Sequence, residues 1–199
     1  MKAKLLAGAP ADLVILTQAL IAELAAGGQL LPDSCADLGR VRTGVAVRAG
    51  DPLPDIASAG ALRSTLLAAA GIFFPDPQKA TAGIHFARVL DTLGIRGEVE
   101  PHLKTYPNGA TAMRELAQAK GEKLVGCTQV TEIKNTPGVA LVGPLPREFE
   151  LATVYSAGLC AGAAAPAAAR RFIELLTGEA SRALRMHAGF ELGTAYTKG

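Results

Sequence analysis

The sequence has no tryptophan and few other aromatic residues: aromatic side chains make up 5% of its 199 residues, and charged side chains 19%. So few rings offer little surface on which unpaired bases can stack. The 20 basic and 18 acidic residues are scattered without runs of one sign, so no charged patch for nucleic acid or anionic lipid is expected. Hydrophobic residues, at 49%, are numerous enough for a packed core, which excludes disordered and fibrous classes.

Long apolar runs are also lacking. No stretch approaches the roughly 18 apolar residues of a membrane span, so no membrane insertion is expected. After residues 1–4 the apolar run covers only residues 5–7 before Gly8, which is too short for the hydrophobic region of a signal peptide. By these residues alone, the chain is expected to be cytoplasmic.

Cysteine and histidine are too sparse and too scattered for a metal site. Cys35, Cys127 and Cys160 lie far apart, and the expectation is buried free thiols without disulfides. The histidines are equally isolated, and the motifs of nucleotide-binding loops, serine hydrolases and zinc proteases are missing. The sequence therefore predicts no metal, no cofactor and no catalytic residue set.

Short apolar runs alternate with helical patterns, which is typical of an α/β fold and favours largely parallel strands. Expected strands cover residues 11–16, 72–74, 124–127, 139–142 and 150–155. The first of these is expected to be buried on both faces. Expected helices begin near Thr17, Ser58, Thr81, Asn108 and Pro166. Of these residues, Thr17, Ser58 and Asn108 are expected N-caps, and Pro166 is expected at the first helical position.

Small polar residues stand between a strand and the following helix at four places. These are Thr17-Gln18, Thr81-Ala82-Gly83, Asn108-Gly109-Ala110 and Thr128-Gln129. In open α/β sheets the carboxyl ends of strands face the ligand crevice, and helix N-termini there present free N–H groups to an anion. Gly83 and Gly109 would let the backbone approach it closely. One such residue alone is more often a helix cap, but the four together indicate an anion site built from neutral donors.

Four segments, in order, resemble the periplasmic molybdate-binding proteins of ABC importers: residues 9–16, 42–47, 81–84 and 187–190. The resemblance covers nearly the whole chain. It implies a two-lobed, periplasmic-binding-protein-like α/β fold with mixed sheets, with residues 1–44 and 154–199 in lobe one and 45–153 in lobe two. It also implies that a small anionic ligand, either molybdate, tungstate or a carboxylate, is enclosed between the lobes by hinge closure. An ABC permease as partner and a periplasmic location follow from the same resemblance.

By position, the resemblance assigns a backbone N–H contact to Ala82 and a second contact to the Cys127-Thr128 step. The family's pocket tyrosine corresponds to Phe149, with Tyr155 as the alternative. The full set of expected ligand-binding residues is Thr17, Thr81, Ala82, Gly83, Asn108, Cys127, Thr128, Phe149 and Tyr155. Family members have a further strand, helix and strand before the segment that corresponds to residues 4–16. Lobe one is therefore expected to be incomplete, and its open sheet edge favours a homodimer.

Two other functions fit the same residues. The resemblance extends to relatives that isomerise an unsaturated tricarboxylate such as aconitate. For that reaction the proton-transfer candidates are His85, Glu132 and Tyr155, and the carboxylate-clamp candidates are Arg40, Arg42 and Lys79. An intracellular ligand-sensing module is the third interpretation, because the bilobal fold also serves as the effector domain of transcription regulators.

Overall fold

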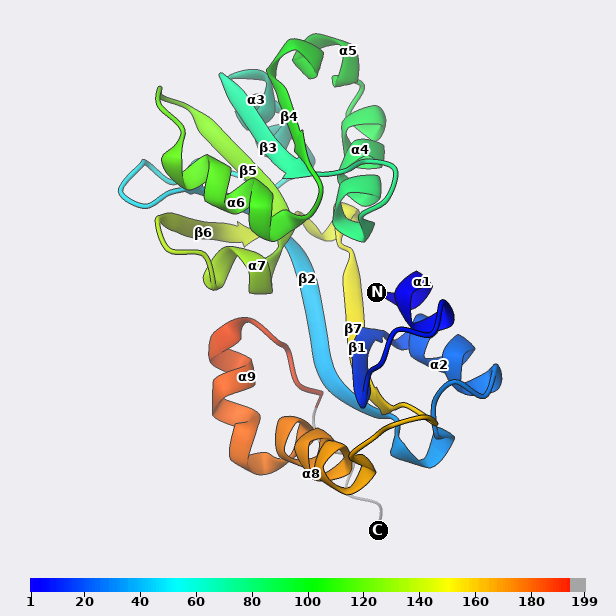
Figure 1. Ribbon diagram of the computed structural model, residues 1–199. Helices are drawn as coiled ribbons and strands as arrows, with labels where there is room; N and C mark the ends of the chain where they lie inside the picture. The colour runs from blue at the N-terminus through cyan, green and yellow to red at the C-terminus, as the bar shows by residue number, and fades with distance from the viewer. Residues whose placement is uncertain (194–199) are drawn as a thin grey trace. The chain divides into compact units, whose positions relative to one another are not determined.

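The computed structural model describes residues 1–193 and divides the chain into two compact units. Unit 1 combines residues 1–41 with the chain from Thr153 onward, and unit 2 is formed by residues 42–152. In Figure 1 the blue amino-terminal and orange carboxyl-terminal segments belong to unit 1, and the green middle of the chain belongs to unit 2. The lobes expected from the sequence, with boundaries at 44/45 and 153/154, differ from these limits by three residues or fewer.

Strands and helices follow one another in an irregular alternation. The strands are β1 (Leu13–Thr17), β2 (Ala36–Arg48), β3 (Gly71–Pro75), β4 (Leu103–Tyr106), β5 (Leu124–Gln129), β6 (Val139–Pro144) and β7 (Ala152–Leu159). The α-helices are α1 (Lys2–Leu6), α2 (Gln18–Ala26), α3 (Ala59–Leu67), α4 (Thr81–Thr92), α5 (Arg96–Val99), α6 (Gly109–Gln118), α7 (Val130–Lys134), α8 (Pro166–Thr177) and α9 (Arg182–Ala188). The 3-10 helices of the described residues are η1 (Pro32–Ser34), η2 (Glu100–His102), η3 (Arg147–Phe149) and η4 (Glu179–Ser181). Within residues 1–193, no helix is long and apolar enough to cross a membrane.

Unit 2 is built on a mixed sheet with the strand order β6-β2-β5-β3-β4. β3 runs parallel to β4 and β5, whereas β2 runs antiparallel to β5 and β6. A mixed sheet is confirmed, but the expected predominance of parallel strands is wrong. The reason is that β2 lies between β5 and β6 and runs antiparallel to both, so the parallel hydrogen-bonded pairs of this sheet are those of β3 with β4 and β5.

Helices cover both faces of the unit 2 sheet. α3 and α4 pack on one face, where they form the α3/α4 core with alternate residues of β2, β3 and β5, among them Val45, Phe74 and Cys127. α6 and α7 pack on the other face around Met113 and Ile133. Because side chains alternate along a strand, each sheet residue contributes to only one of these two cores.

Unit 1 has a smaller sheet, in which β7 lies between β1 and β2. β1 is antiparallel to β7, with Thr17 opposite Tyr155. α2 packs on one face of this sheet and α8 on the other. The expectation that the first strand is buried on both faces is wrong, because in β1 only Val14 is buried and Ile15 is 40% exposed. β1 is an edge strand, with β7 as its one neighbour in the sheet.

Helix caps were predicted with mixed success. Ser58 and Asn108 are confirmed as N-caps: Ser58 Oγ accepts the Ala61 N–H at 3.2 Å, and Asn108 Oδ1 accepts the Thr111 N–H at 2.9 Å. Pro166 is confirmed as the first residue of α8. Thr17 occupies the N-cap position of α2, but its hydroxyl makes no capping hydrogen bond, so that prediction is wrong.

Candidate functional site

Three helices of unit 2 begin at one edge of its sheet. β5, β3 and β4 are parallel neighbours, so their carboxyl ends meet at the same edge. α4, α6 and α7 follow these ends along the chain. The fold therefore brings three of the four predicted polar segments, residues 81–83, 108–110 and 128–129, to one edge of unit 2. The fourth segment, Thr17-Gln18, lies in unit 1.

The N-terminus of α4 is open in the sense that no side chain caps it. Its N-cap is Ala80, which offers no side-chain acceptor, and its first helical bond runs from the Ile84 N–H to the Ala80 carbonyl at 2.9 Å. The N–H groups of Thr81, Ala82 and Gly83 precede that bond and have no partner in the described part of the chain. A side chain at Gly83 would clash with the carbonyl oxygens of Pro75 and Asp76, so glycine is required for α4 to begin against the end of β3.

The loop before α4 adds a charged group. Asp76 Oδ1 accepts the N–H groups of Gln78 at 2.7 Å and Lys79 at 3.2 Å, which fixes the turn. A cavity of about 360 Å³ is lined here by Asp76, Lys79, Thr105, Tyr106 and Pro107. Burial, and secondarily the Glu115 carboxylate, raises the pKa of Tyr106, so its hydroxyl stays protonated at neutral pH. The cavity thus presents an ammonium group and a hydroxyl beside the Asp76 carboxylate, whose Oδ1 is engaged by the loop N–H groups.

The N-terminus of α6 is already occupied by an internal carboxylate. Glu132 accepts the Thr128 hydroxyl at 2.5 Å and the Ala110 N–H at 3.2 Å. A side chain at Gly109 would clash with the Thr128 hydroxyl and the Glu132 carboxylate. The predicted donors Asn108 and Thr128 therefore lie together as expected, but Asn108 caps its own helix and Thr128 binds Glu132.

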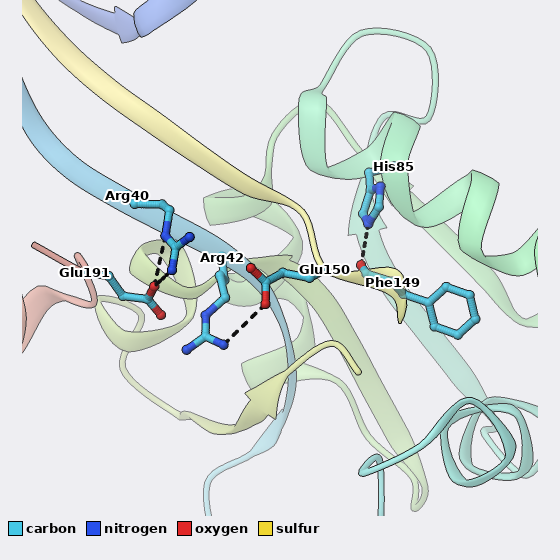
Figure 2. Close-up of polar contacts among 6 residues, drawn as sticks. All are labelled: Arg40, Arg42, His85, Phe149, Glu150 and Glu191. Atoms are coloured by element: carbon cyan, nitrogen blue, oxygen red, sulfur yellow. Dashed lines mark hydrogen bonds and ion pairs between the residues drawn. The ribbon is translucent and has the colours of Figure 1, made fainter. Parts of the chain in front are cut away.

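The remaining predicted residues of unit 2 lie on the α4 side of the sheet. Cys127 is fully buried, and burial raises the pKa of its thiol far above the ordinary value, which leaves it neutral and unreactive. Phe149 packs against the α3/α4 core, and its carbonyl oxygen lies 2.7 Å from His85 Nε2 (Figure 2). A carbonyl oxygen only accepts, so Nε2 carries a proton, and the neutral form of the ring is the tautomer in which Nδ1 is the acceptor.

Two further polar residues at this edge lack partners. Neither was in the expected set of ligand-binding residues, although Gln129 stands in one of the four predicted polar segments. The Thr43 hydroxyl and both polar atoms of the Gln129 amide are buried and make no hydrogen bond within residues 1–193. Thr43 and Gln129 are directly opposite each other in the β2–β5 ladder. Because that register joins distant segments, the sequence carries no local signal of it.

Unit 1 holds its own polar cluster at the start of α2. Asp37 accepts the Ser156 hydroxyl at 2.5 Å and the Gln18 side-chain amide at 3.0 Å. The predicted site residues Thr17 and Tyr155 are paired beside it in the β1–β7 ladder. Within residues 1–193, no group of three or more His, Cys, Asp or Glu side chains is arranged to hold a metal ion.

The candidate carboxylate clamps differ in availability. Arg40 binds Glu191 through Nε and Nη2 at 3.2 and 2.8 Å, and Arg42 lies 3.7 Å from Glu150 (Figure 2). Both arginines already face a carboxylate. Lys79, by contrast, makes no ion pair with any described residue and is exposed beside the open end of α4.

Comparison with known proteins gives one family and a consistent fold. The family model described as "Bacterial extracellular solute-binding protein" matches residues 2–191. A curated relative, an aconitate isomerase from a Pseudomonas species, is 30% identical over 174 residues, which is 84% of this chain and 62% of that protein. The chain thus spans less than two thirds of that relative's length.

Solved structures of binding proteins share the fold at low sequence identity. The periplasmic molybdate-binding protein of Azotobacter vinelandii superimposes with a TM-score of 0.78 at 20% identity, covering 97% of this chain and 83% of that one. The sulfate-binding protein of Mycobacterium tuberculosis gives a TM-score of 0.70 at 21% identity, covering 98% and 73%. The match confirms an α/β fold of the periplasmic-binding-protein type with mixed strands.

Proposed function

Because the chain belongs to the bacterial extracellular solute-binding protein family, we propose that it binds a small oxyanion or organic acid at the carboxyl edge of unit 2. The observation that carries the proposal is the open N-terminus of α4, where three N–H groups have no hydrogen-bond acceptor among the described residues. A helix N-terminus attracts negative charge through these groups and through the helix dipole. Lys79, in the adjoining cavity, adds a formal positive charge, and the Asp76 carboxylate beside it is engaged by two loop N–H groups.

The proposal places the anionic group of the ligand at α4 rather than at α6. At α6 the Glu132 carboxylate already takes the Ala110 N–H and the Thr128 hydroxyl. A second negative group there would be repelled by Glu132 and would find those two donors engaged. Thr81, Ala82 and Gly83 are thus the predicted contacts that remain as direct donors, each through its backbone N–H.

The cellular role follows from the family resemblance and is proposed with it. The chain, or the protein that contains it, would deliver its ligand to an ABC permease in the periplasm. Molybdate and tungstate are the ligands that the resemblance to molybdate-binding proteins favours, and carboxylates remain the other class. A homodimer through the open edge of unit 1 stays a prediction.

Titration calorimetry on the folded chain tests the binding role, with molybdate, tungstate, sulfate, citrate and aconitate as probes. Thr81→Pro removes one N–H of the open helix end. Proline is tolerated at the first helical position, and Ala80, with ψ of 131°, has the extended backbone that a residue before proline needs. We expect at least a tenfold loss of affinity, about 1.4 kcal/mol.

Thr81→Ala is the matched control, because it removes the hydroxyl and keeps the N–H. Its affinity should stay near that of the original chain. Heat from none of the probes, or equal affinity of Thr81→Pro and the original chain, would show that α4 does not bind an anion.

An aconitate-type isomerase is the second candidate, favoured by the 30% identical Pseudomonas relative. Moving a double bond requires a base that removes a proton and returns it at another carbon. His85 suits this task because the Phe149 carbonyl fixes the Nε2 proton, so that in the neutral ring Nδ1 is the nitrogen that can accept a proton. An ultraviolet assay of aconitate isomerisation decides between the candidates. A change of absorbance supports the isomerase, whereas a steady absorbance with aconitate bound rules it out and supports binding without catalysis.

A further inference from the structure

Buried polar side chains in the described chain are bonded with two exceptions. Those that are bonded are Ser34, Thr128, Thr136, Ser156 and Ser181. The exceptions are Thr43, 1% exposed, and Gln129, 4% exposed. An unpartnered buried amide or hydroxyl costs free energy that a native fold rarely leaves uncompensated. The two exceptions stand opposite each other in the β2–β5 ladder, so their unpaired groups form one polar spot.

This spot lies on the same face and at the same edge as the open end of α4. Thr43 lies two positions before Val45 in β2, and Gln129 lies two positions after Cys127 in β5. Side chains two positions apart in a strand point to the same face. Because Val45 and Cys127 belong to the α3/α4 core, all four residues point to the face that α4 covers. Gln129 is the last residue of β5, next to β3. α4 begins where β3 ends, because Gly83 meets the carbonyls of Pro75 and Asp76.

The polar groups of Thr43 and Gln129 are uncharged, and they can both donate and accept hydrogen bonds. The Gln129 amide offers two N–H donors and one carbonyl acceptor, and the Thr43 hydroxyl can donate and accept. A bare oxyanion such as sulfate or molybdate has acceptors only, so it would leave the Gln129 oxygen without a donor. A ligand with a hydroxyl or an undissociated carboxyl group satisfies both sides of the amide.

We propose that Thr43 and Gln129 form a polar subsite that recognises a hydroxyl or undissociated carboxyl group of an organic acid whose anionic end lies at α4. The inference rests on the proposed binding role and narrows its ligand class to acids that also carry a hydrogen-bond donor. Neutral groups that a ligand must satisfy discriminate strongly, because an analogue without the matching group leaves them buried and unpaired.

Two shape-conserving variants test the subsite, Thr43→Val and Gln129→Met, each measured for unfolding and for binding. Because the replaced groups have no partner, we expect unchanged or raised stability in urea. For the acid that binds, we expect about a tenfold loss of affinity. Thr136→Val is the control: its hydroxyl donates to the Glu132 carbonyl at 2.7 Å, so this variant should lose stability and keep the affinity.

Matched acids test the ligand class: citrate against tricarballylate, and malate against succinate, each pair differing by one hydroxyl. The original chain should bind the hydroxylated member of the pair that fits at least fivefold more tightly, and Gln129→Met should lose that preference. If the original chain binds an acid but both variants bind it equally well, or if the variants are destabilised as Thr136→Val is, the subsite is wrong. If the original chain binds no anion at all, the proposed function fails and the subsite with it.

Discussion

Each unit holds one carboxylate in place with a hydroxyl, but the two carboxylates are set in different surroundings. In unit 2, Glu132 lies partly buried against the N-terminus of α6 and binds the Ala110 N–H and the Thr128 hydroxyl. In unit 1, Asp37 is exposed and binds two side chains, Ser156 and Gln18. Glu132 is therefore fixed by a backbone group and a buried hydroxyl. Asp37 can exchange the exposed Gln18 amide for water at little cost, and its one buried partner is the Ser156 hydroxyl.

The hydrophobic cores differ in the same direction. Unit 2 has two cores that contain aromatic pairs: Phe74 and Phe86 meet edge to face at 5.2 Å, and Phe73 stacks on Tyr106 at 6.0 Å. In unit 1 the cores are small, and α8 and α9 expose Phe172, Leu175, Leu184 and Met186. Unit 2 is therefore expected to supply most of the stability, and unit 1 to open first.

The largest expected difference is in the free energy of unfolding of two phenylalanine variants, one in each unit. Phe86→Ala in unit 2 removes a side chain that is 0% exposed, and we expect a loss of about 3–5 kcal/mol in the free energy of unfolding. Phe172→Ala in unit 1 removes a ring that is 47% exposed, for which a change within about 0.5 kcal/mol is expected. Urea denaturation followed by circular dichroism measures both. Comparable losses for the two variants would contradict the contrast between the units.

A smaller effect should separate the two carboxylates. Glu132→Ala leaves the Thr128 hydroxyl buried and unpaired and frees the Ala110 N–H, so we expect a loss of about 2 kcal/mol. Asp37→Ala should cost less, about 1 kcal/mol, because water can replace the carboxylate at the exposed Gln18 amide and only the Ser156 hydroxyl, which is 2% exposed, loses its partner. The same urea experiment measures both, and hydrogen exchange of the Ala110 amide gives a local readout. A greater loss for Asp37→Ala would reverse the assignment of the fixed and the exchangeable carboxylate.

The sequence predicted elements whose signals are local. Ser58 and Asn108 cap helices because each side chain binds an N–H three residues on, and such contacts are readable from spacing alone. The strand at β4 was missed, because its centre, Lys104 and Thr105, is exposed and polar at the edge of the sheet. The opposite error occurred at Ile15, which was expected to be buried but is 40% exposed. An apolar run gives no indication that its strand will lie at an edge of the sheet.

The candidate site was only partly predictable for the same reason. The approach of residues 81–83, 108–110 and 128–129 to one edge follows from parallel strands, and it was expected. The carboxylate that occupies α6 was not, because Glu132 reaches Ala110 across 22 positions of sequence. The pairing of Thr43 with Gln129 likewise depends on strand register, which composition and periodicity leave open.

The smallest expected effect on stability concerns the three thiols, which serve mainly as probes of reactivity. Burial raises the pKa of all three cysteines, and Asp33 adds to the shift at Cys35. Because the raised pKa keeps these thiols protonated, the stability that results is present below about pH 8.5 and is lost as the pH rises above that value. At pH 8 we expect Ellman's reagent to label Cys35 first, since it is half-buried, and to reach Cys127 and Cys160 only as the chain opens.

The order of labelling then reports on the comparison between the units. Cys160 belongs to unit 1 and Cys127 to unit 2, so opening of unit 1 should expose Cys160 at a urea concentration that leaves Cys127 protected. Cys35→Ser removes the fast phase and leaves the other two thiols to be followed separately. Simultaneous labelling of Cys160 and Cys127 at every urea concentration would mean that the units unfold as one, and that the larger cores of unit 2 give it no independent stability.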